Sequence, residues 1–195
     1  LPGPIPLRFV RRYDSNRSSR KGVLGHGWSH SLEQSIWLER GRVVLWDSDG
    51  REIEVQTLDL PGRELAVGQR IEHLREGLLV KRTADRDFEV ETRDGLVRVF
   101  RDVGGHPKGR WVAKLAAIRH RSGNAIDLAY DDKGLLTHVR DSCGRILQLA
   151  YDVDGLLAMV KLPLRAGSGL YMHRRYEFDA RFDLAVITVD RTDLP

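Results

Sequence analysis

The sequence has a single cysteine and no long apolar run. The lone thiol, Cys143, excludes an internal disulfide framework. No stretch of about 18 apolar residues occurs, so we expect no transmembrane helix and no membrane contact by this segment. The opening residues, Leu1–Leu7, lack an initiator methionine and the apolar core of a signal peptide, so we expect a piece of a longer chain.

The chain also has little excess charge and no strong helical pattern. Lys and Arg total 32 and Asp and Glu total 28, so the net charge of +4 is not a nucleic-acid signature by itself. Hydrophobic residues make up 41% and charged residues 31%, which excludes a disordered tail. No helical periodicity of three or more turns appears, so we predict an all-β fold.

A repeat of 21 residues is present in the second half of the chain. Gly123–Val139 and Gly144–Val160 are identical at nine of 17 aligned positions. In the first copy, Ile126, Leu128 and Tyr130 alternate with smaller or polar residues, which predicts a strand with one buried face. An Asp opens the following turn and a Gly allows positive φ. Each repeat is therefore close to one β-hairpin, which is marginal alone and must stack on its neighbours.

Further strands and turns are predicted outside the two clear copies. Two hairpins are predicted, with strands Val43–Trp46 and Arg51–Val55, and Phe88–Thr92 and Leu96–Phe100. A strand is also predicted over Trp111–Arg121, an irregular connection over Gly62–Glu76, and an insertion loop over Arg165–Tyr171. Tyr176–Asp179 resembles a third, degenerate copy, in which Phe178 replaces the repeat Tyr and Phe182 stands where Gly is expected.

The repeat resembles the YD repeat of bacterial Rhs proteins and their relatives. The similarity lies in the pattern Tyr-Asp-x-x-Gly-x-Leu-x-x-Val at Tyr130–Val139 and Tyr151–Val160, and in Asp-x-x-Gly-Arg at Asp141–Arg145. A second similarity, to the opening of the Rhs repeat region, lies in Leu1–Leu7, Arg11–Ser15 and Leu24–Ser31.

The resemblance implies a structural, non-enzymatic part. Rhs repeats wind a strand ribbon into a cocoon around a C-terminal toxin, in many cases an effector of type VI secretion used in competition between bacteria. We therefore expect stacked hairpins that form part of a curved sheet or cocoon wall. The implied partners are the rest of the Rhs shell, the enclosed toxin, a secretion spike protein and a chaperone. The implied location is the bacterial cytoplasm, followed by export.

The resemblance also predicts the boundaries of three segments and the residues of the repeat motif. We predict an opening segment over residues 1–42, a hairpin-rich wall over residues 43–121 and YD repeats over residues 122–195. The residues expected to carry the repeat are Tyr130, Asp131, Gly134, Leu135, Val139, Gly144, Arg145, Tyr151, Asp152, Gly155, Leu156 and Val160. A buried Tyr ring and an Asp-opened turn serve a wall better than a ligand site. Sheet edges of such a segment could also drive self-association.

No catalytic, cofactor or metal site is predicted. His26 and His30 have the spacing of a helical metal pair, but Gly25 and Gly27 argue against a helix and no third ligand is suitably spaced. Cys143 lies in a Ser-Cys-Gly turn, and no nucleophile elbow is recognisable. An enzyme such as a nuclease is therefore the weakest hypothesis.

Two features of the sequence are compatible with a binding function. The densest basic patch comprises Arg8, Arg11, Arg12, Arg17, Arg20 and Lys21, with Tyr13 and Trp28 close by. Such a set could bind phosphate and stack on bases, although we favour a solvated loop or a surface that pairs with cargo or later shell turns. The alternative function is a surface module that binds carbohydrate or protein through exposed Trp37, Trp46 and Trp111.

Overall fold

The predicted all-β fold is confirmed by a computed structural model, which describes residues 1–105, 111–163 and 170–189. Short 3₁₀ helices at Ser15–Arg17 and Pro61–Arg63 interrupt the strands. No helix in these ranges is long and apolar enough to cross a membrane. The strands are β1 Arg11–Tyr13, β2 Lys21–Gly22, β3 Gly25–His26, β4 Trp28–His30, β5 Ser35–Glu39, β6 Arg42–Trp46, β7 Glu52–Gln56, β8 Arg70–His73, β9 Leu78–Ala84, β10 Asp87–Thr92, β11 Leu96–Arg101, β12 Ala113–His120, β13 Ala125–Tyr130, β14 Leu136–Arg140, β15 Ile146–Tyr151, β16 Leu157–Pro163, β17 Leu170–Phe178 and β18 Leu184–Val189.

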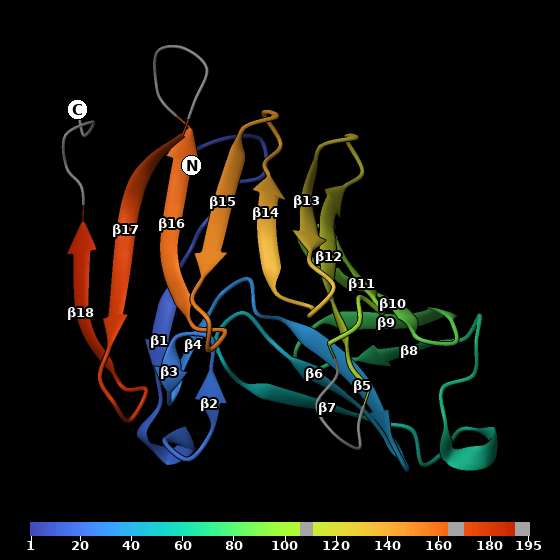
Figure 1. The fold of residues 1–195 in the computed structure, drawn as a ribbon. Helices are drawn as coiled ribbons and strands as arrows, with labels where there is room; N and C mark the ends of the chain where they lie inside the picture. The colour runs from blue at the N-terminus through green and yellow to red at the C-terminus, as the bar shows by residue number, and fades with distance from the viewer. Residues whose placement is uncertain (106–110, 164–169, 190–195) are drawn as a thin grey trace.

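One 14-stranded sheet contains most of the strands (Figure 1). Strands β8 to β18 follow one another in chain order, and each pairs antiparallel with the next, so this part is a continuous series of hairpins. In Figure 1, β13–β18 run upright whereas β8–β11 lie across them, because the sheet bends strongly at β12.

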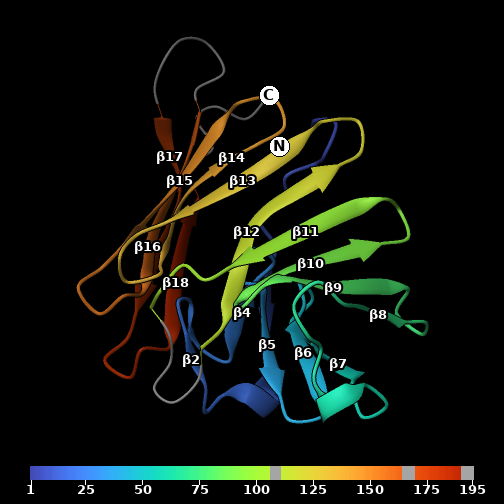
Figure 2. The same ribbon diagram turned by 90° about the vertical axis from the view of Figure 1, so that its right-hand side faces the viewer.

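Strand β12 is a branch point of the sheet. Its first residues, Ala113 and Lys114, pair with Ile36 and Ser35 of β5, whereas residues 117–119 pair with β13. Strands β5–β7 therefore leave the sheet as a separate three-stranded arm, which Figure 2 shows below β8–β11.

The N-terminal segment, residues 1–34, packs against the repeat strands. Its residues Ile5, Leu7, Leu24 and Leu32 belong to the same buried cluster as apolar side chains of β13–β17. Backbone hydrogen bonds attach the segment at separate points. The Leu157 N–H donates to Val23 O (2.7 Å) and the Leu115 N–H donates to Gln34 O (3.0 Å).

The repeat hairpins share one kind of turn. In the repeat turns, the N–H of the fourth residue donates to the carbonyl of the first, as in Gly134 to Asp131 (2.8 Å) and Gly155 to Asp152 (3.2 Å). The fourth residue has positive φ, at 72° in Gly134 and 76° in Gly155. This pattern is typical of the common three-residue hairpin loop, in which a type I turn is followed by a glycine bulge.

The degenerate copy forms the same turn without glycine. Phe182 takes the fourth position with a φ of 63°, and its N–H donates to Asp179 O (2.9 Å). The predicted third hairpin is therefore present as β17 and β18. Residues 164–169 of the predicted insertion loop, Arg165–Tyr171, lie outside the described residues.

The other predicted strands agree with the structure, with one correction. The two hairpins predicted before the repeat are β6–β7 and β10–β11, and the predicted strand over Trp111–Arg121 is β12. The irregular connection predicted over Gly62–Glu76 is wrong in part. Strand β8 forms there because Arg70–His73 pairs with Leu78–Lys81 of β9. Gly68 and the charged residues of this stretch hide the alternation of apolar and polar residues in the sequence.

Candidate functional site

The two repeat tyrosines make the same bridge to a preceding strand. Tyr130 Oη donates to Leu115 O at 2.6 Å, and Tyr151 Oη donates to Leu136 O at 2.8 Å. Leu115 and Leu136 are 21 residues apart, so the two bridges are equivalent steps of one repeat. Burial raises the pKa of both phenols, so they remain protonated donors.

The repeat aspartates are occupied by their own turns. Asp131 Oδ1 accepts from the N–H groups of Lys133 (3.0 Å) and Leu135 (2.8 Å). Asp152 Oδ1 accepts in the same way from Asp154 and Leu156, both at 2.9 Å. These carboxylates order the hairpin turns, which supports a structural interpretation of the Tyr-Asp motif.

The second turn of the repeat, at Asp141–Arg145, also forms hydrogen bonds to the N-terminal segment. Asp141 Oδ1 accepts from the N–H of Cys143 (2.9 Å) and of Arg145 (2.8 Å), and the Arg145 side chain donates to Pro2 O. The Ile5 N–H donates to Ser142 Oγ at 3.2 Å. The Asp-x-x-Gly-Arg motif therefore joins the repeat to the beginning of the chain.

The remaining motif residues lie on the buried side or in the turns. Leu156, Val139 and Val160 are buried, Leu135 is half-buried, and Gly144 has a φ of 78° in its turn. These placements are compatible with the predicted structural roles, which stay predictions.

The two histidines do not share a site. His26 Nδ1 lies 3.1 Å from Ser18 O, whereas His30 is buried and stacks on Phe9 with ring centroids 4.8 Å apart. Burial lowers the pKa of His30 to about 4. Across the described part of the chain, no group of three or more His, Cys, Asp or Glu could hold a metal ion. Cys143 is exposed and free.

The prediction that Trp37 and Trp46 are exposed is wrong. Their exposed fractions are 3% and 5%, because both pack in a small cluster with Val44 and Val112. Trp111 is half-buried and stacks on Phe88 with ring centroids 6.1 Å apart. The three indoles therefore do not form an exposed binding surface.

A hollow of about 190 Å³ lies beside the tyrosine bridges, and we call it the tyrosine hollow. Its polar lining includes Glu33, Lys114, Tyr130 and Tyr151. Lys114 Nζ donates to Gly134 O at 2.6 Å, and burial lowers the pKa of this amine. Burial raises the pKa of Glu33 to about 7, although Arg20 and Lys114 oppose the shift.

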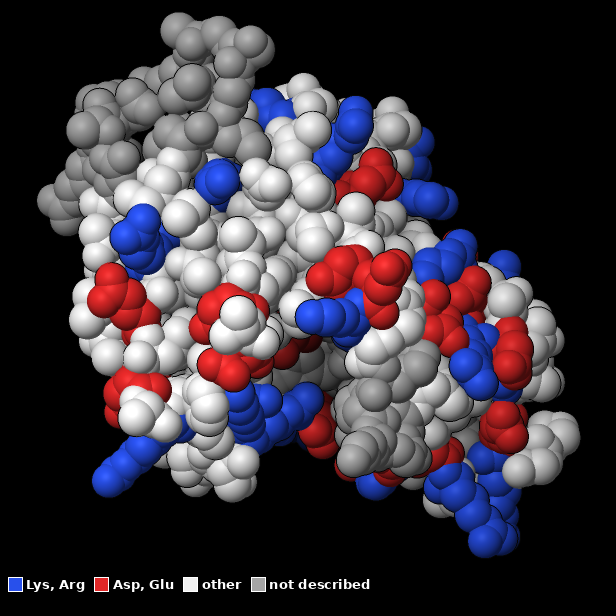
Figure 3. Space-filling model, viewed as in Figure 1, with Lys and Arg blue, Asp and Glu red and all other residues white. Residues whose placement is uncertain are grey.

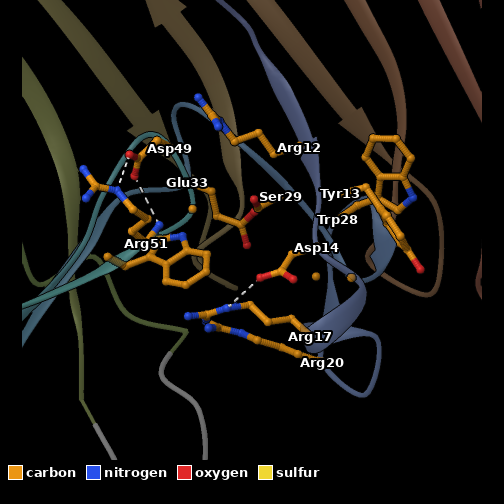
Figure 4. A pocket seen from close by; sticks show the side chains of 14 residues that line it. Arg12, Tyr13, Asp14, Arg17, Arg20, Trp28, Ser29, Glu33, Asp49 and Arg51 are labelled. Atoms are coloured by element: carbon orange, nitrogen blue, oxygen red, sulfur yellow. Dashed lines mark hydrogen bonds and ion pairs between the residues drawn. The ribbon is translucent and has the colours of Figure 1, made fainter.

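A larger hollow, of about 310 Å³, lies beside the first one, and we call it the arginine hollow. Figure 4 shows Arg12 on one side, Arg17 and Arg20 on the other, and Glu33 between them. Glu33, Arg20 and Trp46 line both hollows. The carboxyl of Glu33 therefore lies at the boundary between them.

The structure divides the predicted basic patch. Arg12, Arg17 and Arg20 line the arginine hollow, whereas Lys21 Nζ lies 3.6 Å from the centroid of the Phe182 ring and Arg11 lies over Tyr176. Figure 3 shows basic side chains grouped at the lower edge of one face, where Figure 1 places β2. The sequence identified the arginines but not Glu33 or Lys114, because only folding brings these residues beside them.

The comparisons with known proteins cover only the first part of the chain. Residues 1–55 match the family model of a domain of unknown function, DUF6531. This stretch contains β1–β6 and most of β7, and therefore the arginines of the larger hollow. No match was found among the curated proteins. The all-β architecture is compatible with a repeat protein.

Proposed function

We propose that this chain is a wall segment of an Rhs-type shell, with a structural and non-enzymatic role. The tyrosine bridges are the observation that carries the proposal. Two equivalent bonds, 21 residues apart, tie each repeat hairpin to the strand before it. Such a unit extends a sheet by repetition, because the first strand of each added hairpin pairs with the last strand of the previous one, as β15 pairs with β14.

The shape of the sheet supports the same role. Strands β8–β18 form one continuous antiparallel series, and the sheet bends at β12 (Figure 2). Continuous lateral hydrogen bonding over a curved sheet gives a wall whose unpaired edges, among the described strands, lie only at the outer strands. A wall of this kind would enclose a C-terminal toxin in the producing bacterium until export by a secretion system. Its expected partners remain the rest of the shell, the toxin, a spike protein and a chaperone.

The test uses the complete polypeptide that carries this segment. We expect the region that follows the shell to resist added protease until the shell is unfolded. In the Leu149→Ala variant, which weakens a repeat strand, we expect that protection to fall and the producing cells to grow more slowly. Val153→Ala is the matched control, because Val153 is 98% exposed in the neighbouring turn. A downstream region cleaved at the same rate in the native and the unfolded protein would contradict enclosure.

The alternative hypothesis, a module that binds through exposed tryptophans, has lost its main evidence, since Trp37 and Trp46 are buried. No second function is proposed for the repeat strands.

A further inference from the structure

The arginine hollow contains two guanidinium groups that form no salt bridge with any described residue. Asp14 pairs with Arg17 at 3.4 Å, and Asp49 pairs with Arg51. Arg12 and Arg20 also line the hollow, and neither forms an ion pair with any residue that the structure describes. Arg12 and Arg20 therefore face the hollow without a salt bridge, although Arg20 and Glu33 interact electrostatically at longer range.

Two of the guanidinium groups are held in place by one indole ring. Arg17 and Arg20 lie 4.2 Å and 4.7 Å from the centroid of the Trp46 ring. Stacking on an aromatic face fixes a guanidinium and leaves the N–H groups at its edge free. These N–H groups match the oxygens of carboxylate and phosphate, with which arginine forms paired hydrogen bonds.

An acceptor without a donor lies between the arginines. Glu33 Oε2 is shielded from solvent and has no hydrogen-bond partner within the described ranges. Figure 4 shows this side chain directed into the hollow, between Arg12 on one side and Arg17 and Arg20 on the other. A buried acceptor of this kind normally has a partner, so a ligand with a donor group would satisfy it.

We propose that the arginine hollow binds a small oxyanion, a phosphate or carboxylate group that carries a neighbouring hydroxyl or N–H donor. Arg12 and Arg20 bind the oxygens, stacking on Trp46 fixes the position of Arg20, and Glu33 accepts from the donor. A volume of about 310 Å³ suits a small ligand or one side chain of a peptide. The same chemistry is available from a free sugar phosphate and from an acidic residue of a protein segment.

Isothermal titration calorimetry at pH 7.5 and constant ionic strength tests the site. The probes are inorganic phosphate, ribose 5-phosphate and N-acetyl-glutamate amide. We expect saturable binding of at least one probe at a single site, and at least tenfold weaker binding in the Arg12→Gln/Arg20→Gln variant. Tighter binding of ribose 5-phosphate would identify a free phosphorylated ligand, and tighter binding of the amide an acidic protein segment.

Two further variants make the test specific. Arg40→Gln/Arg121→Gln removes the same charge from exposed positions outside the hollow and should leave the affinity within about twofold. Glu33→Leu should abolish any preference for ribose 5-phosphate over inorganic phosphate, and an unchanged preference would exclude Glu33 from the site. The absence of saturable binding by all three probes, or equal weakening in both double variants, would overturn the proposal. Arg12 and Arg20 are exposed, so their replacement should change thermal unfolding only by the loss of the contact between Arg20 and Trp46.

Discussion

Gly134 and Gly155 occupy the same position in successive repeats but have different surroundings. Both have positive φ, at 72° and 76°. A Cβ on Gly134 would lie 2.7 Å from Gly104 O, whereas a Cβ on Gly155 would meet no atom within 4 Å. We expect Gly155→Ala to cost about 1–2 kcal/mol of unfolding free energy, from backbone strain alone. Gly134→Ala should cost more, because a backbone carbonyl must also move. Chemical denaturation measures both, and equal costs would contradict the difference in surroundings.

Glu33 should make stability depend on pH. Burial raises its pKa in the folded protein to about 7, above the ordinary value of 4.5, so folding favours the protonated form. Stability is therefore lost as the pH rises from about 4.5 to about 7. We expect Glu33→Gln to be more stable than the original protein at pH 8 and to differ little at pH 4. Denaturant unfolding at the two pH values tests this, and a difference that is the same at both would count against it.

Single residues differ in how well the sequence predicted their conformation and burial. The Asp and Gly of each turn were predictable, because positive φ and self-bonded carboxylates are local properties. Phe182 could not be predicted in this way. It adopts the positive φ that glycine usually adopts, and the Lys21 ammonium lies over its ring. Trp37 and Trp46 were predicted to be exposed because some of the residues that cover them, such as Val112 and Arg17, come from distant parts of the chain.

At the scale of one element, β15 provides the strongest test of the repeat. Leu149 is 3% exposed and belongs to the main core cluster. We expect Leu149→Ala to cost about 2–5 kcal/mol of unfolding free energy, because a large buried side chain leaves a cavity. Val153→Ala, at an exposed position of the next turn, should stay within about 0.5 kcal/mol. Similar costs in the two variants, measured by denaturant unfolding, would remove β15 from the core.

Strands with a clear alternation were predictable, and those defined by distant partners were not. Ile126, Leu128 and Tyr130 alternate locally, so β13 could be predicted from its own residues. The pairing of β5 with β12 joins residues 35–36 to residues 113–114, and nothing in either stretch specifies the other. The branch of the sheet, and the hollows beside it, therefore required the structure.

At the scale of the whole molecule, the outer strands of the sheet differ in charge. Strand β8 carries Arg70 and Glu72, and β7 carries Glu52 and Glu54. Strand β18, Leu184–Val189, has no charged residue, and Val186 is 47% exposed. Charges on an edge strand oppose pairing with another chain, whereas an uncharged edge of high β-propensity permits it.

Self-association of the chain should therefore use β18. We expect concentration-dependent association in analytical ultracentrifugation, and we expect Val186→Lys to reduce it by placing a charge on this edge. Glu54→Lys, on the already charged β7, is the control and should leave the association unchanged. Association that persists equally in both variants would mean that another surface is responsible.

The attachment of the N-terminal segment has a consequence for biosynthesis. Ile5 bonds to Ser142, 137 residues further along, and Val23 bonds to Leu157. A ribosome adds about 5–20 residues per second, so Ile5 waits roughly 7 to 27 seconds for Ser142 to be synthesised. During that interval Leu7 and Leu24 lack the apolar side chains of β13–β16 that bury them in the folded protein. The N-terminal segment is thus synthesised well before the repeat strands that complete its packing.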